Sequence, residues 1–374
     1  MHSPTFSKAV IVGCGLIGGS LARALRAHRC VRQLIAVDPD PTCRDEAVER
    51  GVVDLAYETL AEAVPGADLI VFATPVGETC RLLQEVATLP LSQGCILTDV
   101  GSTKKVICTE ARRVLPASVH FIGGHPMAGS EKSGVRAASE RLFQNALWVL
   151  TPYPDTDQLA FQKWASTLLQ IQAQVLVLQP DLHDKVVAAI SHVPHIVAAA
   201  LVDQVATLTR ESMHGGLYTK LAAGGFRDLT RIASGNPVMW RDILLTNGEP
   251  IRELLQQWQA GVGNLLAMME QENGEGMQDF FQTAASFRDA LPNRMRGAVR
   301  SANELTIDVV DEPGVVGQIG TLMGMHGINL HSIGLLESRE DDIGQLLLSF
   351  PNREALDAGA QVLLINGFKV HLRG

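Results

Sequence analysis

One glycine-rich turn limits the folds open to this chain more than any other feature. Residues 8–12 form an apolar run typical of a buried strand, and residues 16–27 have the pattern of a helix. Between them lie Gly13, Gly15 and Gly18 in the pattern G-x-G-x-x-G. The first glycine permits a tight turn, the second lets a phosphate approach the backbone, and the third lets the helix pack on the strand. The pattern predicts a dinucleotide-binding βαβ unit of the Rossmann type. The residues expected to contact the cofactor are Gly13, Gly15, Leu16, Ile17 and Gly18.

An acidic residue at the end of the second strand indicates which dinucleotide binds. The apolar run 33–37 ends in Asp38, which lies about twenty residues after Gly18. A carboxylate at this position accepts hydrogen bonds from the ribose hydroxyls and repels the extra phosphate of NADP. The alternative is a solvated strand-end residue that only precedes the turn at residues 39–41. The spacing favours NAD.

Five further apolar runs are typical of strands in a largely parallel sheet: residues 68–73, 94–98, 119–122, 147–150 and 175–178. The first three are followed by Thr74-Pro75, by Ser102 and by His125. Ligands of open α/β sheets bind at the carboxyl ends of the strands. We therefore predict that residues 6–180 form an NAD-binding domain in which Thr74 and Pro75 contact the cofactor.

The glycine-rich stretch 123–134 contains the most reactive of these residues, His125. Histidine is the side chain best suited to proton transfer near neutral pH. A passive glycine turn with an incidental histidine is the alternative. Its position beside the predicted ends of the other strands favours a catalytic role instead.

The strand pattern stops after Pro180, and residues 181–296 read as an all-helical domain. Pro194 predicts a kink in a long apolar helix, because it cannot donate an N–H to the preceding turn. His192 and His195 flank it and share one helix face, either as core histidines or, with less support, as a metal pair. Apolar residues recur at helical spacing over residues 251–269, which predicts packing against other helices or a partner subunit.

The last part of the chain, residues 303–374, has the pattern of a small α+β domain. A basic stretch near residues 288–300 is a suitable linker. The expected order βαββαβ indicates a ferredoxin-like fold. Its elements are strands near 305–309, 329–337, 344–350 and 368–372, and helices near 315–323 and 353–364.

Composition excludes several classes of partner. The formal net charge of −9 argues against nucleic acid and anionic membranes, and it means that an anionic substrate needs a local cluster of cations. The six cysteines form no C-x-x-C pair, and we expect reduced thiols in a cytoplasmic protein. We expect no signal peptide, no transmembrane helix and no metal.

Five motifs together resemble the prephenate and arogenate dehydrogenase family, and a softer sixth, at residues 311–330, resembles the ACT domain that some members carry. The five are GCGLIGGS (13–20), TDVGSTK (98–104), GGHPMAGSEKSG (123–134), SHVPH (191–195) and GGFRDLTRIASGNPVMW (224–240). The resemblance implies oxidative decarboxylation of prephenate to 4-hydroxyphenylpyruvate with NAD, by a homodimer joined through the helical domain. It also implies regulation by an amino acid, tyrosine above all, near Pro313 and Gly314.

The resemblance assigns roles to the remaining site residues. His125 takes the proton of the ring 4-hydroxyl while hydride leaves for NAD, and Ser102 contacts the same hydroxyl. Arg231 holds the ring carboxylate beside its ionic neighbour Asp228, for which a surface ion-pair network is the alternative. His195 contacts the pyruvyl end of the substrate and favours prephenate over arogenate. Two positions near the active-site entrance complete the set, Gly224 and Trp240. The rival functions are an arogenate dehydrogenase and a catalytically silent regulator that senses NAD and an amino acid.

Overall fold

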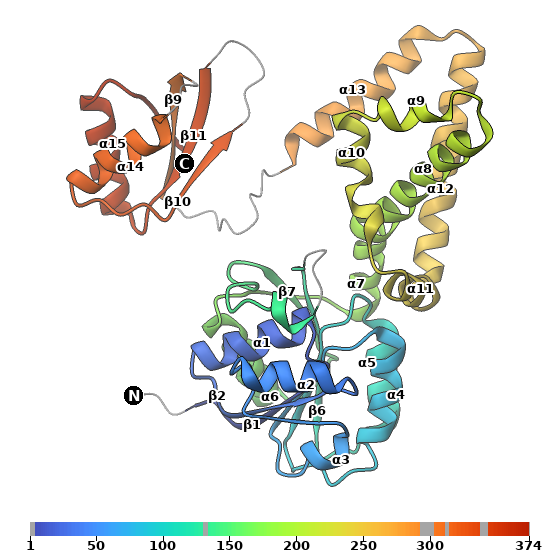
Figure 1. Ribbon diagram of the computed structural model, residues 1–374, viewed down its shortest axis with the longest axis vertical. Coiled ribbons are helices and arrows are strands. Elements are labelled where there is room, and N and C mark those ends of the chain that lie inside the picture. The colour runs from blue at the N-terminus through green and yellow to red at the C-terminus, as the bar shows by residue number, and fades with distance from the viewer. Residues whose placement is uncertain (1–3, 130–133, 292–302, 311–313, 337–342, 374) are drawn as a thin grey trace. The chain divides into compact units, whose positions relative to one another are not determined.

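The computed structural model (Figure 1) describes residues 4–129, 134–291, 303–310, 314–336 and 343–373. It divides into two compact units, residues 1–291 and residues 292–374, and we describe each by itself. Pro313, one of the predicted regulatory residues, lies outside the described residues.

The first unit is built on an eight-stranded sheet with the order β3-β2-β1-β4-β5-β6-β7-β8. All neighbouring strands are parallel except β6 and β7, which are antiparallel. This confirms the predicted Rossmann-type sheet and adds a short strand, β3, that the sequence pattern did not indicate. The strands are β1 (Phe6–Val12), β2 (Val31–Val37), β3 (Leu55–Tyr57), β4 (Leu69–Phe72), β5 (Ile96–Asp99), β6 (His120–Pro126), β7 (Leu147–Thr151) and β8 (Gln174–Val177).

Helices cover both faces of this sheet, and successive residues of each buried strand contribute to different cores. In β1, Ile11 belongs to one apolar cluster, whereas Val10 and Val12 belong to another. This two-sided burial is why the strands read as continuous apolar runs rather than alternating ones. The covering helices are α1 (Leu16–Ala27), α2 (Pro41–Glu49), α3 (Leu60–Ala63), α4 (Val76–Val86), α5 (Lys105–Val114) and α6 (Gln158–Gln170).

The predicted kink before Pro194 is present as a change of helix type. Helix α7 (Pro180–Val187) passes into a π-helical turn, η2 (Ala188–His192), and then into α8 (Val193–Glu211). Pro194 lies in the first turn of α8, where a missing N–H costs least. Wider π turns of this kind are common near functional sites.

The run formed by these three elements, Pro180–Glu211, is long and apolar enough to cross a membrane by length and composition alone. The expectation that the chain has no transmembrane helix stays a prediction, because this criterion tolerates charged residues that the expectation excluded. One such helix is weak support for a membrane span, since the core helices of water-soluble proteins pass the same test.

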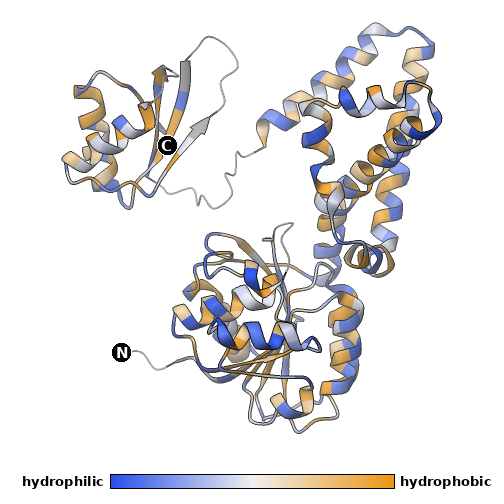
Figure 2. Ribbon diagram, viewed as in Figure 1, coloured by the Kyte–Doolittle hydropathy of each residue, from blue (hydrophilic) through white to orange (hydrophobic). Residues whose placement is uncertain are grey.

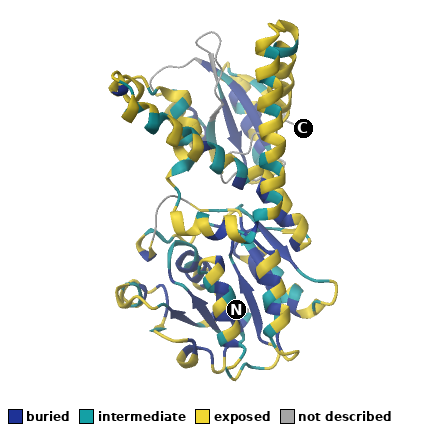
Figure 3. Ribbon diagram, turned by 90° about the vertical axis from the view of Figure 1, so that its right-hand side faces the viewer, coloured by how far each residue is buried: buried dark blue, intermediate teal, exposed yellow. Residues whose placement is uncertain are grey.

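The remaining helices of the first unit extend from the sheet and bury little of their own surface. Among the described residues, their buried cluster consists of Ala188, Ile243 and Ile251, with four partly buried side chains packed against it. Many residues of these helices are apolar (Figure 2), and most of their residues are exposed (Figure 3). The helices and turns are α9 (Gly215–Lys220), α10 (Gly224–Thr230), η3 (Arg231–Ser234), α11 (Pro237–Thr246), α12 (Gly248–Glu270) and α13 (Gly274–Ala290).

The second unit confirms the predicted βαββαβ order. Its antiparallel sheet has the order β10-β11-β9-β12, and α14 and α15 lie on one face of it (Figure 1). Leu305 and Ile307 of the sheet pack with Ile319 and Leu356 of the two helices. The elements are β9 (Glu304–Val310), α14 (Val315–Met325), β10 (Ser332–Leu336), β11 (Ile343–Ser349), α15 (Arg353–Ile365) and β12 (Lys369–Arg373).

Candidate active site

The glycine turn after β1 has the geometry that a dinucleotide requires. Gly13 has φ +91°, and a Cβ there would lie 2.6 Å from the carbonyl oxygen of Ala73. A Cβ on Gly18 would lie 2.0 Å from the carbonyl oxygen of Gly13, so only glycine fits between turn and helix. A Cβ on Gly15 would meet nothing within 4 Å, which leaves its backbone open to a phosphate. Leu16 and Ile17 begin α1 at the same point.

Asp38 is held beside this turn. One oxygen of its carboxylate accepts from the backbone N–H of Cys14 at 3.0 Å, and the other accepts from the N–H of Asp40 at 3.0 Å. Thr74 closes the other side of the turn, and its hydroxyl lies 2.9 Å from that of Thr79. Pro75 precedes the first residue of α4. The residues present therefore fit NAD at this edge of the sheet.

His125 lies inside β6 rather than beyond it. The prediction ended this strand at residue 122, whereas β6 continues to Pro126 because β7 pairs with it and places Val149 opposite His125. Gly124 also lets β6 lie close to the end of β5, since a Cβ there would lie 2.6 Å from the carbonyl oxygen of Asp99. The strand therefore fixes the backbone of the histidine.

A second histidine, His183 of α7, holds the His125 ring. The Nδ1 atom of His125 lies 2.8 Å from Nε2 of His183, and the rings meet edge to face at a centroid distance of 5.1 Å. Nδ1 of His183 lies 2.8 Å from a carboxylate oxygen of Asp184. His183 is fully buried, and Asp184 is 2% exposed. Three side chains thus form a line from α7 to β6, in which Asp184 and His183 are buried and His125 is half-buried.

Asp184 also joins α7 to the loop that follows β5. Its carboxylate accepts the backbone N–H groups of Lys104 at 2.7 Å and Lys105 at 2.9 Å, and so caps the first turn of α5 from another helix. The carbonyl oxygen of Asp184 accepts from the side-chain amide of Asn247 at 2.8 Å.

A buried ion pair fixes the other end of the same loop. The ammonium group of Lys104 contacts the carboxylate of Asp99, and both side chains are fully buried. Asp99 also accepts the backbone N–H groups of Gly101 at 2.8 Å and Gly124 at 3.1 Å. These bonds compensate for burial of the charges. Half-buried Ser102 lies in this loop. The described hydrogen bond of the His125 ring is made with His183 and not with Ser102.

The surroundings favour the neutral forms of His125 and His192. Burial holds the pKa of His125 well below its usual range, and the nearby His183, Lys104 and His192 act in the same direction. Burial also lowers the pKa of His192 to about 4, with Asp184 acting in the opposite direction. A neutral imidazole is the form that can accept a proton at physiological pH.

The structure places His195 and Trp240 next to each other, as expected if both bind the substrate. Their ring centroids lie 4.4 Å apart, and His192 contacts the same indole edge to face at 6.0 Å. Nδ1 of His195 lies 2.8 Å from the carbonyl oxygen of Ser191. Both histidines therefore pack on an aromatic ring, and no group of three possible metal-ligating side chains occurs in the part of the chain that the structure describes.

The other predicted substrate-binding residues lie on exposed surface. Gly224 and Asp228 belong to α10, and Arg231 begins η3. All three are exposed in the single chain. Figure 1 shows α10 farther from the sheet than α7, which carries the partner of His125. At the regulatory site, Gly314 has φ +98° and immediately precedes α14.

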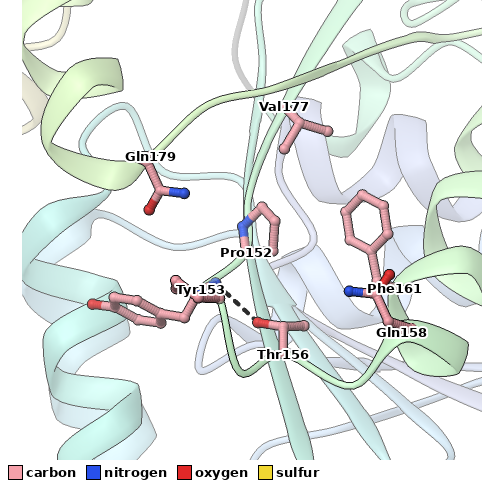
Figure 4. Close-up of a pocket in the computed structure, with 8 residues that line it drawn as sticks. Pro152, Tyr153, Thr156, Gln158, Phe161, Val177 and Gln179 are labelled. Atoms are coloured by element: carbon pink, nitrogen blue, oxygen red, sulfur yellow. Dashed lines mark hydrogen bonds between the residues drawn. The ribbon is translucent and has the colours of Figure 1, made fainter.

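A shallow pocket of about 280 Å³ lies beside the β7–α6 connection (Figure 4). The N–H of Tyr153 donates to the hydroxyl of Thr156 at 2.9 Å within it. Its lining is uncharged and includes none of the predicted site residues, so it lacks the cations that an anionic substrate needs. The lining residues are Pro152, Tyr153, Pro154, Thr156, Gln158, Phe161, Val177 and Gln179.

Sequence reasoning missed His183, Asp184 and the Asp99–Lys104 pair. Asp99 and Lys104 lay inside a recognised motif, but nothing in the spacing indicated that they pair. His183 and Asp184 are 58 and 80 residues from the groups they contact. A histidine–aspartate pair directly after the last strand was the signal that could have found them.

Models of one protein family match most of the chain. The family model for the prephenate dehydrogenase nucleotide-binding domain matches residues 21–177, and that for the dimerization domain matches residues 179–283. A prephenate dehydrogenase of Bacillus subtilis is 40% identical over 341 residues, which cover 91% of each chain.

Solved structures show the same similarity. A prephenate dehydrogenase from A. aeolicus in complex with hydroxyphenyl propionate and NAD+ is 31% identical, with a TM-score of 0.70, and the match covers 75% of this chain and 97% of that one. An arogenate dehydrogenase from Synechocystis is 33% identical, with a TM-score of 0.65, and the match covers 75% and 99%.

Proposed function

Because the chain belongs to the prephenate dehydrogenase family of NAD-dependent oxidoreductases, we propose that it converts prephenate to 4-hydroxyphenylpyruvate by oxidative decarboxylation in the cytoplasm, as a step of tyrosine synthesis. The observation that carries this proposal is the half-buried His125, which lies beside the NAD-binding edge of the sheet, is held by His183 and has a lowered pKa. The chain has a net charge of −9, so an anionic substrate needs local cations or hydrogen-bond donors. The pocket in Figure 4 has an uncharged lining. We therefore place the substrate at the histidines and arginines instead.

His125 is the base in this proposal. The free Nε2 atom of its imidazole takes the proton of the ring 4-hydroxyl, which raises the electron density at C4 and favours departure of hydride. NAD, when bound against Gly13, Gly15, Leu16, Ile17, Gly18, Asp38, Thr74 and Pro75, supplies the hydride acceptor. Ser102 donates to or accepts from the same hydroxyl. A placed base accelerates such a step by about 10²–10⁴-fold.

An arginine and a histidine hold the two carboxylates of prephenate. Arg231, oriented by Asp228, binds the ring carboxylate, and His195 binds the pyruvyl end while it packs on Trp240. Each charge-assisted hydrogen bond contributes about 1.5–3 kcal/mol. Exposure of Gly224, Asp228 and Arg231 in one chain supports an active-site entrance that is completed by the partner in a homodimer.

The substrate assay tests this proposal directly. Purified protein with NAD is given prephenate or arogenate, and NADH is measured by absorbance. We expect turnover of prephenate and a much lower kcat/KM for arogenate, because the amine of arogenate would lie against the imidazole of His195. Preference for arogenate would identify the rival dehydrogenase, and no NADH from either substrate would favour the silent regulator.

The C-terminal unit is proposed to be an ACT domain that binds an amino acid, tyrosine first among the candidates, near Pro313 and Gly314. The βαββαβ order and the left-handed Gly314 before α14 support this assignment. A chain that ends near residue 300 should keep basal activity and lose inhibition by tyrosine. Inhibition that persists would place the effector in the catalytic cleft.

A further inference from the structure

We propose that His183 and Asp184 are positioning residues that hold His125 in the tautomer with a protonated Nδ1, so that Nε2 is free to take the substrate proton. This inference rests on the proposed role of His125 as the base. It adds two residues, neither of which contacts substrate, and a defined path of hydrogen bonds behind that base.

The direction of each hydrogen bond among these three side chains follows from the last of them, Asp184. The carboxylate of Asp184 can only accept, and it already accepts two backbone N–H groups. Nδ1 of His183, 2.8 Å away, must therefore be the donor. In neutral His183 the other nitrogen, Nε2, is then an acceptor, and Nδ1 of His125 donates to it at 2.8 Å. Nε2 of His125 is left with its lone pair.

The arrangement also suits the state after proton transfer. The proton moves from the substrate hydroxyl to Nε2 of His125, and Nδ1 keeps its own proton and its bond to His183. The resulting imidazolium lies one ring away from the carboxylate of Asp184, which partly balances the new charge against the nearby ammonium of Lys104. The same logic underlies catalytic triads, in which a buried acid fixes the tautomer of the working histidine.

Burial makes this line rigid. His183 is fully buried and both of its ring nitrogens have partners, so rotation of the ring would break both hydrogen bonds. Asp184 is anchored by the first turn of α5, whose preceding loop carries Ser102. Through this carboxylate, the orientation of the base is coupled to the loop that holds a second catalytic residue.

A purely structural role is the competing explanation, because the His183–Asp184 pair also fastens α7 to the α5 loop. Two substitutions separate these roles. The amide nitrogen of asparagine can occupy the position of Nδ1 and keep the bond to Asp184, but asparagine is too short to reach His125. The amide oxygen of glutamine can occupy the position of Nε2 and accept from His125, but it loses the bond to Asp184.

The experiment compares His183→Asn with His183→Gln in the full-length protein. We expect His183→Asn to lose about 100-fold or more in kcat with little change in the KM for prephenate, and His183→Gln to remain within about 10-fold of wild type. NADH affinity and thermal stability serve as folding controls. If His183→Gln is the more damaged variant, or if both are affected equally, the tautomer role is wrong.

Nitrogen-15 NMR of the histidine rings provides a second test that does not depend on the variants or on turnover. With the His125 signals assigned by loss in a His125→Asn sample, Nδ1 should be protonated and Nε2 unprotonated at pH 7.5. The opposite tautomer overturns the inference. If the wild-type protein makes no NADH from prephenate, the proposed function fails, while the NMR result still decides the tautomer.

Discussion

The two halves of the first unit satisfy their own side chains to very different degrees. Around the sheet, two large apolar clusters are complete and the polar groups near His125 pair with one another. Among the helices beyond α7, the buried cluster has three members, and α10 and α13 bury no residue. The sheet, its covering helices, α7 and η2 therefore form what we call the finished half, whose side chains find their partners within a single chain. The helices from α8 to α13 form the unfinished half, which leaves both apolar surface and predicted substrate-binding residues exposed.

The two halves therefore carry different parts of the proposed reaction. The proposed proton-transfer and NAD-binding groups lie on or beside the strands of the sheet and on α7, and hydrogen bonds within one chain hold His125 and Asp38 in place. The residues proposed to bind the substrate carboxylates lie on surface that a second subunit would cover. We infer that substrate binding depends on dimerisation and that the chemical step depends on groups already ordered in one chain.

Loss of the base should have the largest effect. His125→Asn removes the proposed proton acceptor but keeps a small polar side chain near the end of β6, so we expect kcat to fall by about 10²–10⁴-fold. The glycine turn and Asp38 are untouched, and NADH affinity measured by fluorescence titration should stay within twofold. Unchanged turnover would show that the finished half does not supply the base.

A charge on the exposed apolar stripe of α12 tests the unfinished half. Leu266 is 54% exposed and lies on one helix face with Trp258, Val262 and Met269. Leu266→Glu places a carboxylate in the proposed interface and should weaken the dimer by about 100-fold or more, since burial of an unpaired charge costs several kcal/mol. Analytical ultracentrifugation over a concentration series measures this shift.

The matched control lies in the finished half. Leu159 of α6 is 76% exposed, and Leu159→Glu introduces the same charge without affecting the proposed interface. It should leave the dimer intact. Equal effects from both substitutions, or from neither, would remove the argument that the helical surface is the interface.

Substitution of the exposed cation should separate binding from chemistry. Arg231→Gln removes a charge-assisted bond to the ring carboxylate and should raise the KM for prephenate by about 10- to 100-fold, equivalent to about 1.5–3 kcal/mol. The effect on kcat should be smaller than that of His125→Asn. Arg227→Gln, one turn away and also exposed, is the control and should change KM less than threefold. A fall in kcat with constant KM would place Arg231 in the chemical step.

Sequence patterns predicted the finished half well because its signals are local. The glycine spacing, the apolar strands and the acidic residue at position 38 each depend on neighbours in the chain. His183 and Asp184 escaped because their partners are 58 and 80 residues away and only the packing of α7 on the sheet brings them together. The extension of β6 through His125 was missed for the same reason, since it depends on pairing with β7.

The smallest predicted effect concerns His192, which stands where the two halves meet. It is 1% exposed, and its Nδ1 atom lies 3.2 Å from the amide nitrogen of Asn247, an arrangement that suits the neutral ring. Since its pKa is about 4 in the folded protein, compared with 6.5 ordinarily, the unfolded chain binds the proton first as pH falls. The free energy of unfolding should therefore decrease between pH 6.5 and pH 4, by about 3 kcal/mol at the lower limit.

The variant His192→Asn lacks this titration, so denaturant unfolding of the two proteins at fixed concentration isolates it. Wild type should be the more stable at pH 7.5, because the variant loses buried packing against Trp240. That advantage should shrink steadily below pH 6.5, whereas the difference between wild type and His214→Asn, which alters an exposed histidine, should not change with pH. A constant difference for His192→Asn would mean that the junction admits enough water to protonate His192 in the folded state, and the finished half would then end before η2.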